Sequence, residues 1–266
     1  MTQRPIHRWH GESDLPTIVC LHGFMGTGGD FSIVADAYLD HPTLMAPDFP
    51  DYANEPVRYD HPWTATLETL NNLFDDETGD RPCILLGYSM GGRIALQYAL
   101  QYPQKLNGLV LVGATPGICD GTERAERIRK DIEQASALLN EPINSFLKTW
   151  SRQSIIHTQD RIPEPFRERM RKTRLSNNKQ ALAYYLTALG TGSMNPVWDQ
   201  LSELRLPTLL VTGEEDKKFT NIARDMMRHL PNGTFETIPD AGHAPCFEQP
   251  LIFAEVLEKF IKERLD

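Results

Sequence analysis

Three side chains that together could carry out proton-transfer or nucleophilic chemistry each follow a stretch of sequence that reads as a β-strand. Ser89 is the centre of a G-x-S-x-G motif at residues 87–91, between the apolar run 83–86 and the helix-like run 92–99. A turn this tight favours residues without a Cβ at its flanks and projects the serine Oγ from the end of the strand. A serine hydroxyl is a weak nucleophile and proton relay unless an imidazole, itself oriented by a carboxylate, lies within hydrogen-bond reach. The motif therefore predicts two such partners elsewhere in the chain.

The partners are expected after other strands, because reactive groups of a parallel sheet gather at the carboxyl ends of its strands. Asp216 follows one apolar run of this kind, and His243 follows another in a loop that a preceding glycine allows to turn. We predict that Ser89, Asp216 and His243, in that chain order, form a catalytic triad. The neighbouring Glu214 and Glu215 remain alternative carboxylates.

Backbone N–H groups near the serine could stabilise a developing negative charge. Phe24 stands in a glycine-rich loop after the apolar run 17–21, and Met90 directly follows the serine at the start of a predicted helix. We predict that the N–H groups of Phe24 and Met90 form an oxyanion hole. For His22, in the same loop, we prefer a structural role in which the ring hydrogen-bonds its own loop.

Two further residues lie close to the serine. Arg93 follows it by four positions and so shares its helix face, either as a clamp for a carboxylate or as a structural ion-paired group. Tyr88 precedes it and is expected to donate a hydrogen bond or to pack.

The elements that must position these groups follow an α/β pattern. Short apolar runs alternate with longer amphipathic ones, which indicates a mostly parallel sheet with helices on both faces. Between residues 115 and 195 helical patterns replace the strands. We predict a core formed by residues 1–114 and 196–266, with residues 115–195 inserted as a helical lid over the strand ends. The predicted strands are 17–21, 44–46, 83–86, 109–113, 208–213 and 235–238, and the clearest helices are 30–39, 62–74 and 250–264.

Charge is distributed unevenly between the two predicted parts. Residues 115–195 hold 13 Lys+Arg and 9 Asp+Glu, a net of +4, whereas the remainder holds 14 and 27, a net of -13, which together make the -9 of the chain. A positive lid on a negative body suggests a small anionic ligand, although a solvated helical surface with mixed charges is the better explanation for most of these arginines.

Composition excludes several classes of function. The net charge of -9 and a pI near 5.4 disfavour nucleic-acid binding. No apolar run is long enough to cross a membrane or serve as a secretory signal. The four cysteines are widely spaced, which favours a reduced cytoplasmic setting over disulfides or zinc. No phosphate-binding motif or metal cluster is present, so we expect no cofactor and no metal.

Seven short segments together are more distinctive than the motifs taken singly. They are LHGFMG at 21–26, GYSMGGR at 87–93, TPG at 115–117, RAER at 124–127, FLKTW at 146–150, VWD at 197–199 and GEEDKKF at 213–219. The chain resembles the α/β-hydrolase superfamily over nearly its full length. Within it, these segments resemble the 2-succinyl-6-hydroxy-2,4-cyclohexadiene-1-carboxylate synthases (SHCHC synthases, the MenH family) of menaquinone and phylloquinone biosynthesis. The matches in the predicted lid matter most, because many unrelated activities share the core motifs.

The resemblance implies a lyase rather than a hydrolase. Enzymes of this family remove a proton from a cyclohexene carboxylate that bears succinyl and pyruvyl groups, and eliminate pyruvate to leave a conjugated diene. Ser89 would relay the proton to His243. The substrate carries several carboxylates, which arginine forks bind bidentately. The resemblance implies oxyanion N–H groups from Phe24 and Met90 and substrate contacts from Tyr88, Arg93, Arg127, Trp150 and Arg174.

One segment departs from the superfamily pattern. Many members follow the aspartate after an early strand with a proline and a glycine–histidine–glycine turn, which residues 48–54 lack. We expect this difference to affect substrate detail more than reaction class. Other arginines near the two assigned ones in the lid are alternatives for the same role, namely Arg124, Arg129 and Arg171.

Two other functions are also to be considered for this sequence. The same triad and oxyanion groups would serve an esterase or a carbon–carbon bond hydrolase. A non-catalytic receptor or scaffold of the same fold is disfavoured by the complete triad, because a binding module does not need all three groups.

Overall fold

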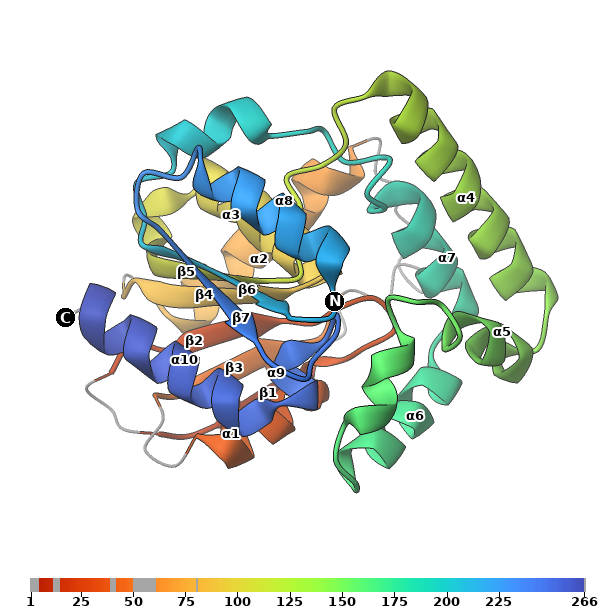
Figure 1. Ribbon diagram of the computed structural model, residues 1–266, viewed down its shortest axis with the longest axis horizontal. Helices are drawn as coiled ribbons and strands as arrows, with labels where there is room; N and C mark the ends of the chain where they lie inside the picture. Colours follow the sequence, from red (N-terminus) through yellow and green to blue (C-terminus); the bar gives the residue numbers. More distant parts are fainter. Residues whose placement is uncertain (1–4, 12–14, 39–41, 50–60, 80, 266) are drawn as a thin grey trace.

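The computed structural model describes residues 5–11, 15–38, 42–49, 61–79 and 81–265. Within these residues a seven-stranded sheet has the order β1-β3-β2-β4-β5-β6-β7, in which β1 is antiparallel to β3 and all other neighbours are parallel (Figure 1). The mostly parallel sheet predicted from the sequence is confirmed. The strands are β1 (Ile6–Trp9), β2 (Ile18–Leu21), β3 (Leu44–Pro47), β4 (Cys83–Tyr88), β5 (Leu106–Val112), β6 (Thr208–Gly213) and β7 (Gly233–Ile238).

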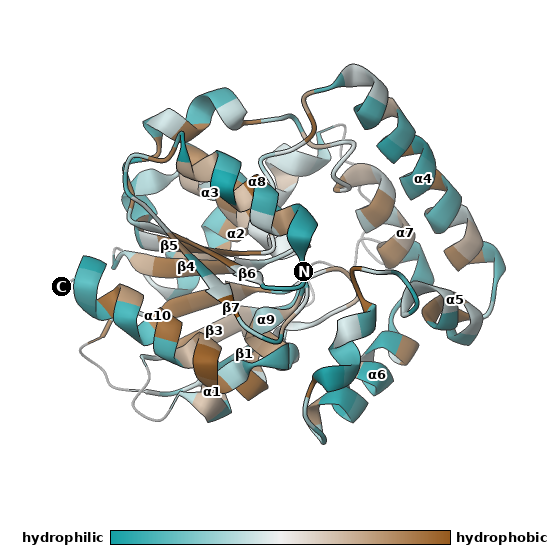
Figure 2. Cartoon of the chain, in the orientation of Figure 1, coloured by the Kyte–Doolittle hydropathy of each residue, from teal (hydrophilic) through white to brown (hydrophobic). Residues whose placement is uncertain are grey.

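The inner strands are almost completely buried and mostly apolar, because helices cover both faces of the sheet. Successive side chains point to opposite faces, so each strand contributes to two cores. In β2, Val19 and Leu21 join one buried cluster, while Ile18 and Cys20 join the other. The hydropathy colouring shows the apolar residues concentrated on the strands (Figure 2).

The helices of the core form two layers. Helices α2, α3 and α8 cover one face of the sheet, and α1 and α10 pack together on the other (Figure 1). Their bounds are α1 (Ser32–Ala37), α2 (Pro62–Glu77), α3 (Met90–Gln101), α8 (Lys217–Met227) and α10 (Pro250–Arg264), with the short elements η1 (Gly28–Phe31), η2 (Pro103–Lys105), η4 (Trp198–Glu203) and α9 (Pro245–Glu248) between them.

Residues 115–195, which we call the helical segment, leave the sheet after β5 and return before β6. Helices α4 and α7 pack against each other, and the whole group lies to one side of the sheet (Figure 1). Side-chain caps begin both helices, since Asp120 accepts from the Glu123 N–H and Asn178 from the Gln180 N–H. The elements are α4 (Gly121–Asn140), α5 (Ile143–Trp150), η3 (His157–Arg161), α6 (Phe166–Ser176) and α7 (Lys179–Ala188).

Two features differ from the expectations of sequence patterning. Strand β1 was not predicted, because as a partly exposed edge strand it has no apolar run. The helix expected over residues 30–39 is instead the 3₁₀ turn η1 followed by the short helix α1. Among the described helices, none combines the length and the hydropathy needed to cross a membrane.

Candidate active site

Ser89 lies on the sharp turn between β4 and α3. Its φ is 51° and its ψ -105°, and its N–H donates to the Val112 carbonyl at 2.8 Å. Gly91, in the first turn of α3, packs so closely on β2 that a Cβ there would lie 2.2 Å from the Leu21 carbonyl oxygen. The glycine thus allows α3 to start directly against the sheet, which leaves the Ser89 side chain at the carboxyl end of β4.

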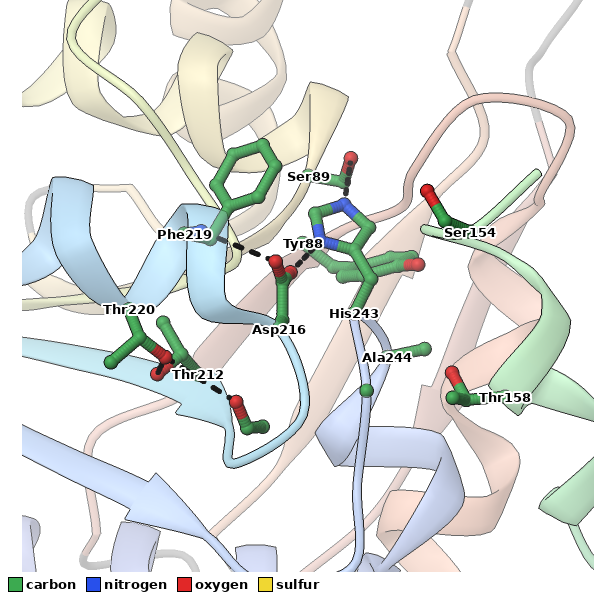
Figure 3. Close-up of polar contacts among 12 residues, drawn as sticks. Tyr88, Ser89, Ser154, Thr158, Thr212, Asp216, Phe219, Thr220, His243 and Ala244 are labelled. Atoms are coloured by element: carbon green, nitrogen blue, oxygen red, sulfur yellow. Dashed lines mark hydrogen bonds and ion pairs between the residues drawn. The ribbon is translucent and has the colours of Figure 1, made fainter.

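The side chains of Ser89, His243 and Asp216 form a continuous chain of hydrogen bonds (Figure 3). His243 Nε2 lies 2.9 Å from Ser89 Oγ, and His243 Nδ1 lies 2.6 Å from Asp216 Oδ2. The other oxygen of Asp216 accepts the Phe219 N–H at 3.2 Å at the start of α8. Because an ionised carboxylate can only accept, Nδ1 carries the ring proton and Nε2 is left to accept the serine proton. His243 is 3% exposed, so this arrangement is shielded from bulk water.

The rival carboxylates lie elsewhere. Glu215 makes a bidentate pair with Arg161, at 2.6 and 3.1 Å, and the Glu214 side chain is exposed. Of the three acidic residues in this loop, Asp216 is the one that contacts His243.

A cavity of about 390 Å³ lies over Ser89 and His243. Phe24 reaches it from the loop after β2, and its ring packs on that of Trp150 from α5, with 5.1 Å between the ring centroids. The core and the helical segment therefore both contribute walls. Asp216 lies behind His243, whereas the other residues predicted for the site line the cavity, namely Phe24, Tyr88, Ser89, Met90, Arg93, Arg127, Trp150, Arg174 and His243.

Two guanidinium groups meet at one wall of this cavity. Arg93 is 8% exposed and donates to the Leu189 carbonyl at 2.7 Å, and Arg127 Nε donates to Asp131 Oδ1 at 2.8 Å. Burial, together with the positive charge of Arg127, lowers the pKa of Arg93 to about 9, so it remains a cation at neutral pH. The hydrogen bond of Arg93 goes to a neutral carbonyl rather than to a carboxylate. An anionic ligand would offset the repulsion between the two arginines.

A hydrogen-bonded relay links Arg174 to the residue before the serine. Arg174 donates to Gln159 Oε1 at 2.8 Å, and Gln159 Nε2 donates to the Tyr88 hydroxyl at 3.2 Å. The Tyr88 ring also packs against the rings of His243 and Phe247. Burial raises the pKa of Tyr88 well above its ordinary value, so the phenol is neutral. Tyr88 thus both hydrogen-bonds and packs.

Several residues that line the cavity are not predicted from the sequence. Lys130 could have been found, because it lies three positions after Arg127 on the same helix face. Asp30 and Gln159 carry no comparable signal, since their places depend on how distant segments fold together. Burial raises the pKa of Asp30 to about 6, even though the nearby charge of Arg174 acts in the opposite direction. Lys218, at the start of α8, adds another cation to the cavity wall.

His22 has the structural environment that we preferred for it. Its Nε2 accepts the Phe49 N–H at 3.1 Å, so its Nδ1 carries the proton and donates to the Gly23 carbonyl at 2.9 Å. Burial, the main cause, lowers the pKa of His22, which keeps the ring neutral. Both ring nitrogens are therefore committed to backbone groups.

The alternative arginines of the helical segment bind protein groups outside the cavity. Arg124 donates to the Gly192 carbonyl, Arg129 pairs with Glu133, and Arg171 pairs with Glu168. In the atypical segment 48–54, residues 50–54 lie outside the described residues, so the expectation about that loop stays a prediction. No group of three or more His, Cys, Asp or Glu side chains within the described ranges could hold a metal ion.

Comparison with known proteins agrees with this geometry. Residues 16–250 match the model of the alpha/beta hydrolase fold, and the chain therefore belongs to the α/β-hydrolase class of proteins. A Bacillus subtilis protein provisionally named 2-succinyl-6-hydroxy-2,4-cyclohexadiene-1-carboxylate synthase is 34% identical over 94% of this chain and 92% of its own length. An Escherichia coli synthase of the same name is 30% identical, over 91% and 92%.

A solved structure leads to the same family. MenH from Staphylococcus aureus superposes with a TM-score of 0.90 at 28% identity and covers 100% of both chains. Within the α/β-hydrolase class, this chain belongs to the MenH family of 2-succinyl-6-hydroxy-2,4-cyclohexadiene-1-carboxylate synthases.

Proposed function

We propose that this protein is a carbon–oxygen lyase that converts 2-succinyl-5-enolpyruvyl-6-hydroxy-3-cyclohexene-1-carboxylate into pyruvate and 2-succinyl-6-hydroxy-2,4-cyclohexadiene-1-carboxylate, a step of menaquinone and phylloquinone biosynthesis. The observation that carries the proposal is the Ser89–His243–Asp216 chain of hydrogen bonds beneath a cavity walled by arginines. The names of the relatives support the same reaction.

The proposed chemistry uses the serine as a proton relay. Ser89 Oγ takes the ring proton of the substrate while His243 Nε2, 2.9 Å away, accepts the hydroxyl proton. The electron pair of the broken C–H bond forms one double bond of the diene, the electron pair of the original ring double bond moves along the ring to form the other, and the C–O bond to the enolpyruvyl group breaks. The proton held on His243 then returns to the departing enolpyruvate, which becomes pyruvate. The Phe24 and Met90 N–H groups would stabilise negative charge that develops on a substrate oxygen.

The walls of the cavity suit such a substrate. It is a small molecule with several carboxylates, and the cavity presents the cationic side chains Arg93, Arg127, Lys130, Arg174 and Lys218. Residues 115–195 would act as a lid that carries three of these cations. The cytoplasmic location stays a prediction from the sequence.

The test is pyruvate release by the purified protein, measured with a coupled lactate dehydrogenase assay. Ser89→Ala should lower kcat/KM by about 10³-fold or more, because the relay atom is lost while the fold is kept. Circular dichroism and the Tm of the variant check that it is folded.

A parallel assay with an aryl ester separates the lyase from an esterase on the same fold. Rapid ester hydrolysis without pyruvate release would contradict the proposal and favour the hydrolase. A wild-type protein inactive on both substrates, and unaffected by Ser89→Ala, would favour a non-catalytic role.

A further inference from the structure

The short element η3 contacts the immediate neighbourhood of all three proposed triad residues. It belongs to the helical segment, yet each of three side chains in it reaches a different strand end of the core. Thr158 reaches the loop of His243 through Glu248, Gln159 reaches Tyr88, and Arg161 reaches Glu215. These targets adjoin His243, Ser89 and Asp216 respectively.

Glu248 is the centre of the first of these connections. It is 4% exposed, and its carboxylate accepts the Gly242 N–H at 2.7 Å and the Ala244 N–H at 3.1 Å, the two amides that flank His243. Its third donor is the Thr158 hydroxyl at 3.0 Å. A carboxylate bonded on both sides of His243 fixes the backbone that aims the imidazole at Ser89.

Thr158 and the histidine loop are also in steric contact. A Cβ at Gly242 would lie 2.1 Å from Thr158 Oγ1, so the close approach of η3 requires glycine at that position. In the close-up view Thr158 lies next to Ala244, the residue that follows His243 (Figure 3). Thr158 is 4% exposed, and its hydroxyl faces the core rather than water.

The other two connections act on the remaining strand ends. Gln159 donates to the hydroxyl of Tyr88, whose backbone leads directly into the Ser89 turn. Arg161 forms its bidentate pair with Glu215 and also donates to the Asp240 carbonyl at 3.1 Å. The last residue of β4 and the loops after β6 and β7 are therefore hydrogen-bonded, directly or through Glu248, to one five-residue element.

We propose that η3 holds the triad in its reactive geometry and that Glu248 is a positioning residue for His243. None of Thr158, Arg161 and Glu248 needs to touch the substrate for this role. Since a displacement of about 1 Å in a reacting group lowers a rate by about 100-fold, loss of one such hydrogen bond should appear in kcat rather than in KM. The turnover part of the test rests on the proposed function, whereas the chemical reactivity of Ser89 does not.

Thr158→Val is the sharpest variant, because it removes the hydroxyl and keeps the shape of the side chain. We expect it to lower kcat by about 10-fold or more with KM nearly unchanged, and Thr158→Ser, which retains the hydroxyl, to restore most of the rate. The matched control is Thr187→Val, since the hydrogen bonds of the Thr187 hydroxyl within the described part of the chain are to carbonyls of its own helix α7. A Thr158→Val enzyme with unaltered kcat, or one that Thr158→Ser does not rescue, would overturn the proposal.

The second readout is the rate at which phenylmethanesulfonyl fluoride modifies Ser89, followed by mass spectrometry of the intact chain. This small neutral reagent needs His243 to accept the serine proton but needs no arginine. Thr158→Val and Glu248→Gln should slow the modification by about 10-fold or more relative to wild type. Unchanged rates in folded variants, or a wild-type Ser89 that does not react, would contradict the positioning role.

The ion pair is tested in the same way. Arg161→Met should slow Ser89 modification, whereas Arg171→Met, which removes a bidentate pair confined to α6, should not. If wild type reacts with the reagent and the η3 variants slow it but no pyruvate is released, the lyase proposal fails and the positioning inference stands. If pyruvate is released but the variants match wild type in both assays, the lyase proposal stands and the positioning inference fails.

Discussion

Among single residues, Arg93 is the one whose role in substrate binding can be tested most clearly apart from catalysis. It is a buried cation beside Arg127, and among the residues that the structure describes its hydrogen bond is to the Leu189 carbonyl. Keeping like charges together in a buried wall is unfavourable unless an anion is bound there. Asp131 supplies one negative charge to the pair, through its 2.8 Å contact with Arg127 and its effect on Arg93. A carboxylate of the substrate would balance the second positive charge.

Arg93→Met should therefore raise KM for the proposed substrate by about 10- to 100-fold, because it removes one or two charged hydrogen bonds to the substrate. The effect on kcat should be smaller. Steady-state pyruvate release measures both constants. Arg124→Met is the matched control, because Arg124 bonds to the Gly192 carbonyl away from the cavity. Equal KM values for the Arg93 and Arg124 variants would show that Arg93 is structural.

The sequence could predict the triad because each member follows a strand, and the ends of parallel strands meet at one edge of a sheet. Residues on the helical segment were harder to place. Arg127 and Trp150 were assigned through family resemblance, whereas the contact between Gln159 and Tyr88 spans 71 positions and follows no local pattern. Glu248 stands only five residues after His243, but its contact with both flanking amides depends on α9 turning back over the loop.

Among the elements, the turn from β4 into α3 imposes the tightest packing. A Cβ on Gly91 would collide with the backbone of β2, which cannot move without shifting the centre of the sheet. Gly121, at the start of α4, has open space around the same position.

Gly91→Ala should lower the free energy of unfolding by roughly 3 kcal/mol or more, because overpacking against backbone outweighs the gain of about 1 kcal/mol from helix propensity. Gly121→Ala should be neutral or slightly stabilising. Urea unfolding followed by circular dichroism compares the two variants with wild type. A Gly91→Ala protein as stable as the Gly121→Ala protein would refute the packing argument.

Elements with a strong apolar pattern were predicted with nearly correct bounds, as for α10 at Pro250–Arg264. The failures have a common physical cause. Strand β1 is stabilised by pairing with β3 rather than by burial of its own side chains, so hydropathy does not reveal it. The turn η1 precedes α1 because Asp30 accepts the Thr27 N–H, a contact of the kind that competes with a regular helix.

For the whole molecule, Asp30 connects folding stability to pH. Its pKa is about 6 in the folded protein, against the ordinary value of 3.8 for an aspartate, so the folded state retains a proton that the unfolded chain releases. The stabilisation that protonated Asp30 contributes is complete below about pH 4, declines as the pH rises, and is lost above about pH 6. A shift of this size corresponds to about 3 kcal/mol.

Asp30→Asn removes this titration. The free energy of unfolding of the variant minus that of wild type should increase by about 3 kcal/mol from pH 4 to pH 7, because only wild type loses stability over this range. Urea unfolding of both proteins across that range provides the measurement. Parallel pH profiles for the two proteins would show that Asp30 titrates normally in the fold.

The attachment of η3 at three separate strand ends has a consequence for how such proteins diversify. An insert joined to its core by two chain crossings could be exchanged between relatives as an independent module. Here a transplanted helical segment would also have to form hydrogen bonds with Tyr88, Glu215 and Glu248 of the recipient core. Substitutions in the helical segment and in the core are therefore constrained by one another.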